Sequence, residues 1–431
     1  QDQGNGFKKK EDAQKLICEL STQQPLICTV EKIERKKENK NPPLLFNLAE
    51  LQNVCSKLFK ISPDETLSIV QDLYEKKLVT YPRTDARVLS TAVAKEIYKN
   101  ISGLRNYPQA GEAAQGALEL GAYKNIAKTR YTNDKQITDH YAIIPTGQGL
   151  GALKGLSLTA QRVYETIVRR FLSIFYPPAV YQKVSLVTKM ENESFFSSFK
   201  VLLSEGYLKI AANSFAKKSM AEASGKTPES EGEGEVSCDE ALLAALQKLK
   251  KGDILNINGL GIKEGETSPP KRYNSGSMIL AMENAGQLIE DEELRAQIKG
   301  SGIGTSATRA EILKKLVNIK YLALNKKTQV ITPTLQGEMI YDVVDHSIRS
   351  LLNPELTASW EKGLNYVAEG SITSDEYMRK LDHFITSRTV GVKGLNNQYQ
   401  LRACYEKAAG FYPSVNSNKT TGRTKTGSRS K

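Results

Sequence analysis

Apolar residues recur at helical spacing in several separate parts of the chain. These parts are residues 11–20, 48–60, 62–77, 90–101 and 159–175. The stretch 62–77 also carries a start signal, because Ser62 can cap a helix, Pro63 suits the first helical position and Glu65 completes a capping box. The pattern therefore predicts a well-anchored helix that leads directly into residues 78–90.

Other stretches are rich in β-branched and aromatic residues and are bounded by polar turns, which is typical of strands. They cover residues 25–37, 179–190, 195–204 and 251–262. We predict a mixed α and β, multidomain fold, in which a helical domain is inserted into a β-rich domain and a mainly helical domain follows. The predicted boundaries are 1–40 and 178–270 for the two parts of the β-rich domain, 41–177 for the insert, 271–390 for the second helical domain, and 391–431 for a basic tail that is largely disordered at its end.

The charge balance narrows the class of partner. Lysine and arginine outnumber aspartate and glutamate by 60 to 48, which gives a formal net charge of +12. This surplus favours a polyanion, and nucleic acid is preferred to an anionic membrane because the sequence has no long apolar run.

The five cysteines include no Cys-x-x-Cys pair, so neither a zinc ribbon nor a disulfide framework is indicated, and a reducing cytoplasm is expected. The first residues lack a signal-peptide pattern and an initiator methionine, so we expect the middle part of a longer protein.

The segment 78–90, LVTYPRTDARVLS, places Tyr81 and Arg83 two positions apart with Pro82 between them. Proline disfavours helix at the preceding residue, and in extended backbone residues i and i+2 leave the same face. A tyrosine hydroxyl is a weak nucleophile unless positive charge stabilises the phenolate, and an arginine can do this while it binds a phosphate. Alone, Tyr-x-Arg is weak evidence, because a half-buried tyrosine beside a solvated arginine is common.

Two further motifs contain candidate groups. TDHYAIIPTG (138–147) sets His140 after a carboxylate that can hold its imidazole, and the imidazole can then offer a proton or a hydrogen bond to a phosphate. SGIGTSATRAEILKKL (301–316) has glycines that let the backbone approach a ligand, hydroxyls that can cap a helix beginning near Ala307, and an arginine in its first turn. Its candidate phosphate-binding residues are Gly302, Gly304, Thr305, Ser306, Thr308 and Arg309. The motif lacks the lysine of a nucleotide P-loop.

Together and in this order, the three motifs resemble the signature blocks of type IA DNA topoisomerases. Two more stretches share the resemblance: TSPPKRYNSGSMILAMENAG (267–286) and LTASWEKGLNYVAEG (356–370). The proline after the tyrosine and the sequence HYAIIPTG are similar to the bacterial topoisomerase III branch. The resemblance extends from the first predicted helix to about residue 390.

The resemblance implies that Tyr81 attacks a single-strand phosphodiester and leaves a 5′-phosphotyrosine, with Arg83 and His140 assisting at the scissile phosphate. It places the 302–309 residues in a domain that grips single-stranded DNA. The β-rich domain is then a gate, on which the insert carrying the tyrosine swings so that a second strand can pass before religation. The expected partner is single-stranded or underwound duplex DNA. We expect a monomer with no membrane attachment, located in the cytoplasm with the nucleoid.

The acidic, Mg²⁺-binding domain that begins this family matches no part of the 431 residues. We therefore expect Mg²⁺ to be bound outside this chain, no metal site within it, and no DNA relaxation by the chain alone. Two alternatives remain. A tyrosine-dependent relaxase or recombinase is disfavoured because no two of the three histidines are close neighbours and Tyr81 lies early in the sequence. A single-stranded DNA-binding module with an inert Tyr81 would differ only in its lack of covalent chemistry.

Overall fold

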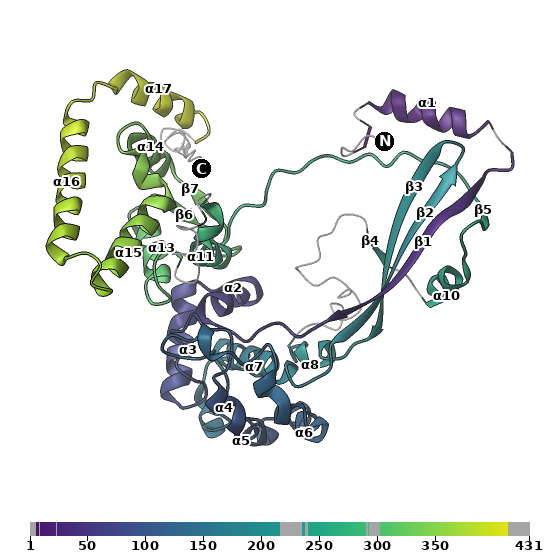
Figure 1. The fold of residues 1–431 in the computed structure, drawn as a ribbon, viewed down its shortest axis with the longest axis horizontal. Coiled ribbons are helices and arrows are strands. Elements are labelled where there is room, and N and C mark those ends of the chain that lie inside the picture. Colours follow the sequence, from purple (N-terminus) through teal and green to yellow (C-terminus); the bar gives the residue numbers. More distant parts are fainter. Residues whose placement is uncertain are drawn as a thin grey trace, which may run out of the picture. The chain divides into compact units, whose positions relative to one another are not determined.

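The computed structural model describes residues 6–7, 9–22, 24–215, 235–237, 240–289, 292 and 302–412. The chain divides into two compact units, and each is assembled from separate segments. The first unit comprises residues 1–45, 88–134 and 144–270, and the second comprises residues 46–87, 135–143 and 271–431. Helices and strands both contribute, so the predicted mixed α and β class is confirmed (Figure 1).

The first unit contains a five-stranded sheet with the strand order β4-β3-β2-β1-β5 (Figure 1). The strands are β1 (Ile27–Lys40), β2 (Ala179–Met190), β3 (Glu193–Ser204), β4 (Glu235–Ser237) and β5 (Ile254–Asn256). β1 pairs antiparallel with β2 and β5, β2 pairs antiparallel with β3, and β4 joins β3 in parallel. The strand predicted at 251–262 is reduced to the three residues of β5. Because β1 and β2 are neighbours, the chain between them leaves the sheet and returns to it.

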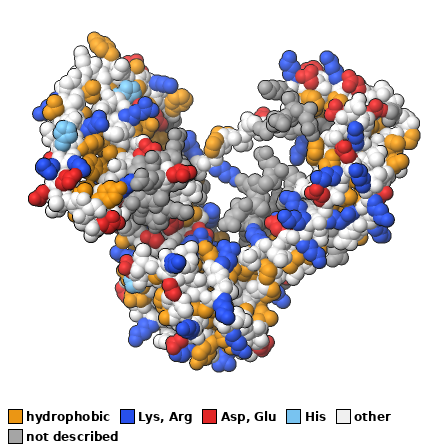
Figure 2. Space-filling model, in the orientation of Figure 1, with side chains coloured by type: hydrophobic (Ala, Val, Ile, Leu, Met, Phe, Trp, Pro, Cys, Tyr) orange, Lys and Arg blue, Asp and Glu red, His pale blue; other side chains and the backbone are white. Residues whose placement is uncertain are grey.

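From Gln182 to Val187 in β2, buried and partly exposed residues alternate, as expected for an antiparallel sheet packed on one side. The buried cluster consists of Val30, Val184, Leu186, Val201 and, from α10 (Glu240–Lys248), Leu246. Elsewhere in the sheet, Lys36, Lys183 and Lys200 are register partners across β1, β2 and β3. Figure 2 shows lysine and arginine side chains gathered over this part of the unit. Some of the excess lysine and arginine residues of the sequence therefore lie together on the surface of the first unit.

The other helices of the first unit are α1 (Lys10–Leu20), α4 (Thr91–Glu96), α5 (Tyr98–Gly103), α6 (Gly111–Leu120), α7 (Leu158–Ser173) and α8 (Leu208–Ala211). The single helix predicted at 90–101 is two helices, because α4 ends at Glu96 and α5 begins at Tyr98. Within α7, the buried Glu165 accepts hydrogen bonds from Arg169 Nε (3.0 Å) and from the backbone and hydroxyl of Ser214 (both 2.7 Å). These bonds satisfy a carboxylate that would be costly to bury alone.

The second unit is mainly helical. It contains α2 (Leu48–Phe59), α3 (Pro63–Glu75), α11 (Ser275–Glu283), α13 (Arg309–Asn318), the hairpin of β6 (Leu322–Leu324) and β7 (Ile331–Pro333), α14 (Leu335–Asp345), α15 (Pro354–Ala368), α16 (Ser374–Lys393) and α17 (Gln398–Ala409). Its buried cluster joins four of these elements through Ala49, Ile279, Leu313 and Ile331. A Cβ atom on Gly276 would lie 2.5 Å from Asn53 Cα, so glycine permits the close approach of α11 to α2.

The helices predicted at 11–20, 48–60, 62–77 and 159–175 are confirmed as α1, α2, α3 and α7. The β6–β7 hairpin was not predicted. Within the predicted tail, α16 continues to Lys393 and α17 follows it, and residues 413–431 lie outside the described part of the chain. The predicted domain boundaries stay a prediction, and both compact units contain residues of the range 41–177.

Candidate active site

Tyr81 lies in a non-helical segment that follows α3 in the second unit. The start of α3 is as predicted: Ser62 accepts a hydrogen bond from the Glu65 N–H group, and Pro63 occupies the first helical position. Tyr74, near the end of α3, packs edge to face on Tyr81 with their ring centroids 5.5 Å apart. A capped helix thus presents one of the aromatic contacts of the candidate nucleophile.

Two threonines fasten the segment on either side of Tyr81. Thr80 Oγ1 donates to the carbonyl of Ala142 (3.0 Å), and Thr84 Oγ1 donates to the carbonyl of His140 (2.7 Å). Both acceptors belong to the histidine motif, which lies about 60 residues further along the chain. Side-chain hydrogen bonds therefore hold the tyrosine segment and the histidine segment together.

Exposure alternates along the tyrosine segment. Pro82 and Thr84 are buried, Tyr81 is half-buried, and Arg83 and Asp85 are exposed. This is the pattern that extended backbone predicts, and it puts the tyrosine and the arginine on one side. Arg83 makes no ion pair within the described residues.

His140 rests against the candidate nucleophile. Its ring centroid lies 4.4 Å from that of Tyr81, with the planes tilted by 43°. The expectation that Asp139 holds the imidazole is wrong in this structure, because within the described ranges no hydrogen bond joins Asp139 to the ring. The His140 position is set instead by its backbone carbonyl, which Thr84 binds, and by ring contact with Tyr81.

A cluster of charged and polar groups lies beside the tyrosine segment. Arg309 Nη1 is 3.0 Å from Asp85 Oδ1 and 4.0 Å from Glu283 Oε1. Asn47 Nδ2 donates to Glu283 Oε1 (2.7 Å) and to the Asp85 carbonyl (3.1 Å). Burial raises the pKa of Glu283, the Arg309 guanidinium opposes this rise, and the Asp85 carboxylate adds to it. The cluster thus joins two carboxylates through one guanidinium.

The glycines of the third motif make internal contacts. Gly302 has φ +64° and Gly304 has φ +67°, values that favour glycine. A Cβ atom on Gly302 would lie 2.4 Å from the Met282 carbonyl oxygen and 2.5 Å from that of Glu283. The expectation that Gly302 makes room for a ligand is therefore corrected: it makes room for the end of α11.

The helix after these glycines begins later than predicted, at Arg309 instead of near Ala307. The Thr305 carbonyl accepts hydrogen bonds from the N–H groups of Thr308 and Arg309, both at 3.0 Å. Thr308 Oγ1 does not cap the helix but accepts from the Thr305 N–H group (2.9 Å). Thr305 and Thr308 are exposed and Ser306 is half-buried, so these hydroxyl residues remain at the surface.

Arg309 itself is not at an open phosphate site. Its side chain is only 1% exposed, because Asp85 and Glu283 already surround the guanidinium. The physical reason lies in the tertiary structure. Arg309, in the first turn of α13, is close in space to carboxylates of two other segments and pairs with them. The structure therefore brings Tyr81 and His140 together and links the third motif to them through an internal ion pair.

The family model described as DNA topoisomerase matches residues 1–379, which is most of the chain. The chain belongs to this family. It is 33% identical over 362 residues to DNA topoisomerase 3 of Bacillus licheniformis, an alignment that covers 83% of this chain and 46% of that protein. It is 31% identical over 390 residues to DNA topoisomerase 3 of Bacillus subtilis, with 90% and 49% covered. The topoisomerase chain thus spans about half the length of these curated relatives.

The fold is also similar to a solved structure, full-length topoisomerase I from Thermotoga maritima. The TM-score is 0.59 at 22% sequence identity, and the match covers 90% of this chain and 55% of that one. The resemblance to type IA topoisomerases of the topoisomerase III branch is therefore confirmed at the level of family and fold. The relaxase, recombinase and inert-module alternatives are not favoured.

Sequence reasoning missed some of the topoisomerase residues that shape this site. Glu283 is the clearest case, since it lies within a quoted block, and a single carboxylate at the end of the apolar helix SGSMILAME was a usable signal. Tyr74, in the helix predicted at 62–77, was not named as a site residue, whereas it contacts Tyr81. Its ring contact depends on how the chain turns after α3, which no periodicity encodes.

No three His, Cys, Asp or Glu residues in the described ranges come together in a way that could hold a metal ion. Across the same part of the topoisomerase chain, no helix is long and apolar enough to span a membrane.

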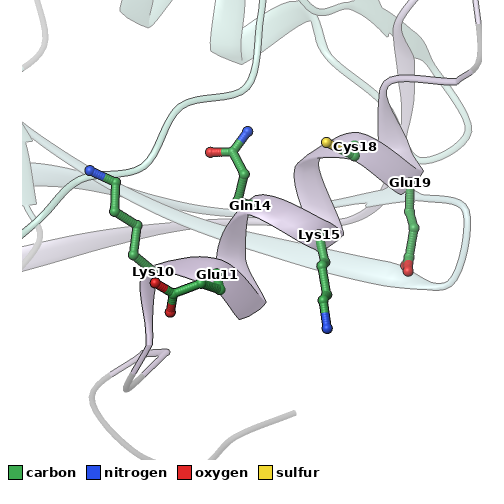
Figure 3. A pocket seen from close by; sticks show the side chains of 6 residues that line it. All are labelled: Lys10, Glu11, Gln14, Lys15, Cys18 and Glu19. Atoms are coloured by element: carbon green, nitrogen blue, oxygen red, sulfur yellow. The ribbon is translucent and has the colours of Figure 1, made fainter.

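A hollow of about 570 Å³ lies along α1 in the first unit (Figure 3). Its lining residues are Lys10, Glu11, Gln14, Lys15, Cys18 and Glu19. All six come from one helix, and the candidate catalytic residues are not among them. The candidate active site is therefore defined by its motifs and contacts and not by this hollow.

Proposed function

We propose that this chain is the part of a type IA topoisomerase III that carries the nucleophile, cleaves one DNA strand, and reseals it after another strand has passed. The main observation is the placement of Tyr81, half-buried between Tyr74 and His140, with Arg83 exposed on the same side. The family match supports the same reading. Single-stranded or underwound DNA is the proposed substrate, and the protein is proposed to act as a monomer.

In the proposed reaction, Tyr81 Oη attacks the phosphorus of a phosphodiester and loses its proton. The bond from phosphorus to O3′ breaks, the 3′ oxygen gains a proton, and the 5′-phosphate stays attached to the tyrosine. Religation is the reverse attack by the 3′-hydroxyl, so the energy of the diester is kept and no nucleotide is consumed. Arg83 is assigned to the charge that develops on the phosphate, because a guanidinium binds phosphate oxygens in pairs.

His140 is assigned to hydrogen bonding at the same phosphate, since its ring packs on that of Tyr81. Thr305 and Thr308 are proposed to contact the DNA backbone, because both are exposed and their segment is tied to the tyrosine segment. Gly302, Gly304 and Ser306 shape that loop.

At the domain level, we propose that the 41–177 insert carries the tyrosine and moves relative to a β-rich gate made of residues 1–40 and 178–270. The observation that supports an insert is topological: β1 and β2 are neighbours in the sheet, although the whole helical segment separates them in sequence. Residues 271–390 are proposed to form a DNA-binding domain.

Mg²⁺ is proposed to be required and to bind outside this chain, because the resemblance assigns it to an acidic domain that matches no part of the 431 residues. When bound, the ion would supply positive charge at the DNA phosphates. Because the chain spans about half of its relatives, we expect the remaining family regions to be needed for relaxation of DNA.

The test uses the protein at full family length with an oligonucleotide labelled at either end. A 3′-labelled strand should become attached to protein under denaturing conditions, and a 5′-labelled strand should be released as a shorter fragment. Tyr81→Phe should abolish the adduct while DNA affinity is kept, because it removes only the nucleophilic oxygen. Tyr74→Phe is the matched control, an adjacent tyrosine whose loss should leave the adduct. An adduct that persists in Tyr81→Phe would move the nucleophile elsewhere.

A further inference from the structure

Arg309 is one of the most deeply buried charged residues that the structure describes. Its guanidinium contacts Asp85 Oδ1 (3.0 Å) and Glu283 Oε1 (4.0 Å), and its Nε donates to the Ile303 carbonyl (3.2 Å). A buried cation is costly without such partners, and removing one partner of a buried pair is strongly destabilising. The two carboxylates therefore fix both the position and the direction of this side chain.

The cluster connects segments that are remote in sequence. Asp85 belongs to the tyrosine segment, Ile303 to the glycine loop, and Glu283 ends α11. Asn47, which caps α2 through its side-chain oxygen, closes the network by donating to both Glu283 and Asp85. The Arg309–Asp85 contact alone spans 224 positions. One guanidinium thus ties the surface loop of Thr305 to the backbone that carries the nucleophile.

The ion pair between Arg309 and Asp85 also affects the charge around Arg83. Asp85 and Arg83 are two positions apart and both exposed on the side of Tyr81. An unpaired Asp85 carboxylate would lie within reach of the Arg83 guanidinium, and it would also repel a DNA phosphate. Because Arg309 pairs with Asp85, the carboxylate is compensated from within the protein. Arg83 makes no ion pair in the described part of the chain, which is the state needed to bind phosphate.

We propose that Arg309 is a positioning residue for the tyrosine site: by binding Asp85 it fixes the Tyr81 segment against the glycine loop and keeps Arg83 free for the DNA phosphate. This inference rests on the proposed function. It differs from the sequence prediction, in which Arg309 contacted DNA directly.

The experiment compares Arg309→Gln, Asp85→Asn and the double variant in the protein at full family length. The readouts are the single-turnover cleavage rate and the dissociation constant for a single-stranded oligonucleotide. Arg309→Gln should lower the cleavage rate by about 10²-fold, the size expected for misplaced reacting groups. Affinity should change by less than about threefold, because Arg309 is buried against Asp85 and Glu283 and is not proposed to contact DNA.

The double variant separates positioning from a structural role. In Arg309→Gln, the Asp85 carboxylate is unpaired and can bind Arg83. The double variant lacks this carboxylate, so it should cleave at least about tenfold faster than Arg309→Gln. Arg309→Lys keeps the charge and should retain more activity than Arg309→Gln. Lys314→Gln is the matched control, since Lys314 is an exposed cation of the same helix that pairs with Asp64 at 3.3 Å. Its cleavage rate should be that of the wild type.

Several results would overturn the inference: wild-type cleavage by Arg309→Gln, a parallel loss of affinity and rate, or a double variant no faster than the single one. If Arg309→Gln does not fold, the double variant carries the test, because it removes both charges of the pair together. It should then cleave within about tenfold of wild type, and loss of cleavage with intact affinity would count against the proposal. Failure of the proposed function itself is distinguishable, since Tyr81→Phe would then retain the adduct.

Discussion

Replacing Thr84 by valine isolates the hydrogen bonds that hold the candidate nucleophile segment. Thr84 is 4% exposed, its hydroxyl donates to the His140 carbonyl at 2.7 Å, and the same oxygen accepts from the Ala86 N–H group at 3.1 Å. Valine has almost the same shape but neither donor nor acceptor. The substitution therefore leaves two backbone groups without their partner while the packing is kept.

The expected cost follows from the surroundings of those two groups. A buried polar group that loses its partner costs about 1–3 kcal/mol. Ala86 is 7% exposed, so its N–H group should have the larger cost, whereas the carbonyl of the exposed His140 can bind water. Together we expect Thr84→Val to lower the free energy of unfolding by about 2–4 kcal/mol. Thr84→Ser keeps the hydroxyl and loses one methyl group, which should cost about 1 kcal/mol.

Urea unfolding followed by tryptophan fluorescence measures the difference, because the single tryptophan, Trp360, lies in the same unit as Thr84. Hydrogen exchange at the Ala86 amide gives the local readout and should accelerate in Thr84→Val alone. The valine variant should also form less covalent adduct, since His140 is no longer fastened beside Tyr81. Equal stability of the valine and serine variants would refute the argument that these hydrogen bonds hold the segment.

Three further outcomes are expected. Gly276→Ala should destabilise the second unit by about 1–3 kcal/mol in urea unfolding, because its new Cβ would lie 2.5 Å from Asn53 Cα. Unchanged stability would mean that α2 and α11 can move apart at little cost, and that the glycine is not needed for their close approach. Burial raises the pKa of Glu283 above its ordinary value of 4.5, so the folded state holds that proton more tightly than the unfolded state does. The free energy of unfolding should therefore fall as pH rises through the folded pKa, and Glu283→Gln should flatten this part of the curve of stability against pH. An unaltered curve in Glu283→Gln would contradict the assignment of this pH dependence to Glu283. Arg83→Ala should lower the cleavage rate by about 10²–10³-fold with a much smaller effect on DNA affinity, whereas normal cleavage with weak binding would make Arg83 an anchor.

Local sequence determined much of the scaffold around the site. The capping residues Ser62 and Pro63 and the apolar stripe of α3 predicted a helix ending just before the tyrosine, and the structure has it. The proline after Tyr81 predicted non-helical backbone, and the alternating exposure from Tyr81 to Asp85 agrees. These features depend on neighbours within a few residues, so periodicity and capping chemistry are sufficient to find them.

Only the tertiary structure decided which of the candidate groups are exposed and which contact each other. Sequence pattern made Arg309 a phosphate ligand and Gly302 a place for a ligand, whereas the fold buries Arg309 on Asp85 and presses Gly302 against the end of α11. Likewise, His140 is held by Thr84 and not by its neighbour Asp139. Each of these outcomes depends on contacts between residues tens to hundreds of positions apart. A charged side chain binds the nearest opposite charge in space, and a linear pattern does not contain that distance.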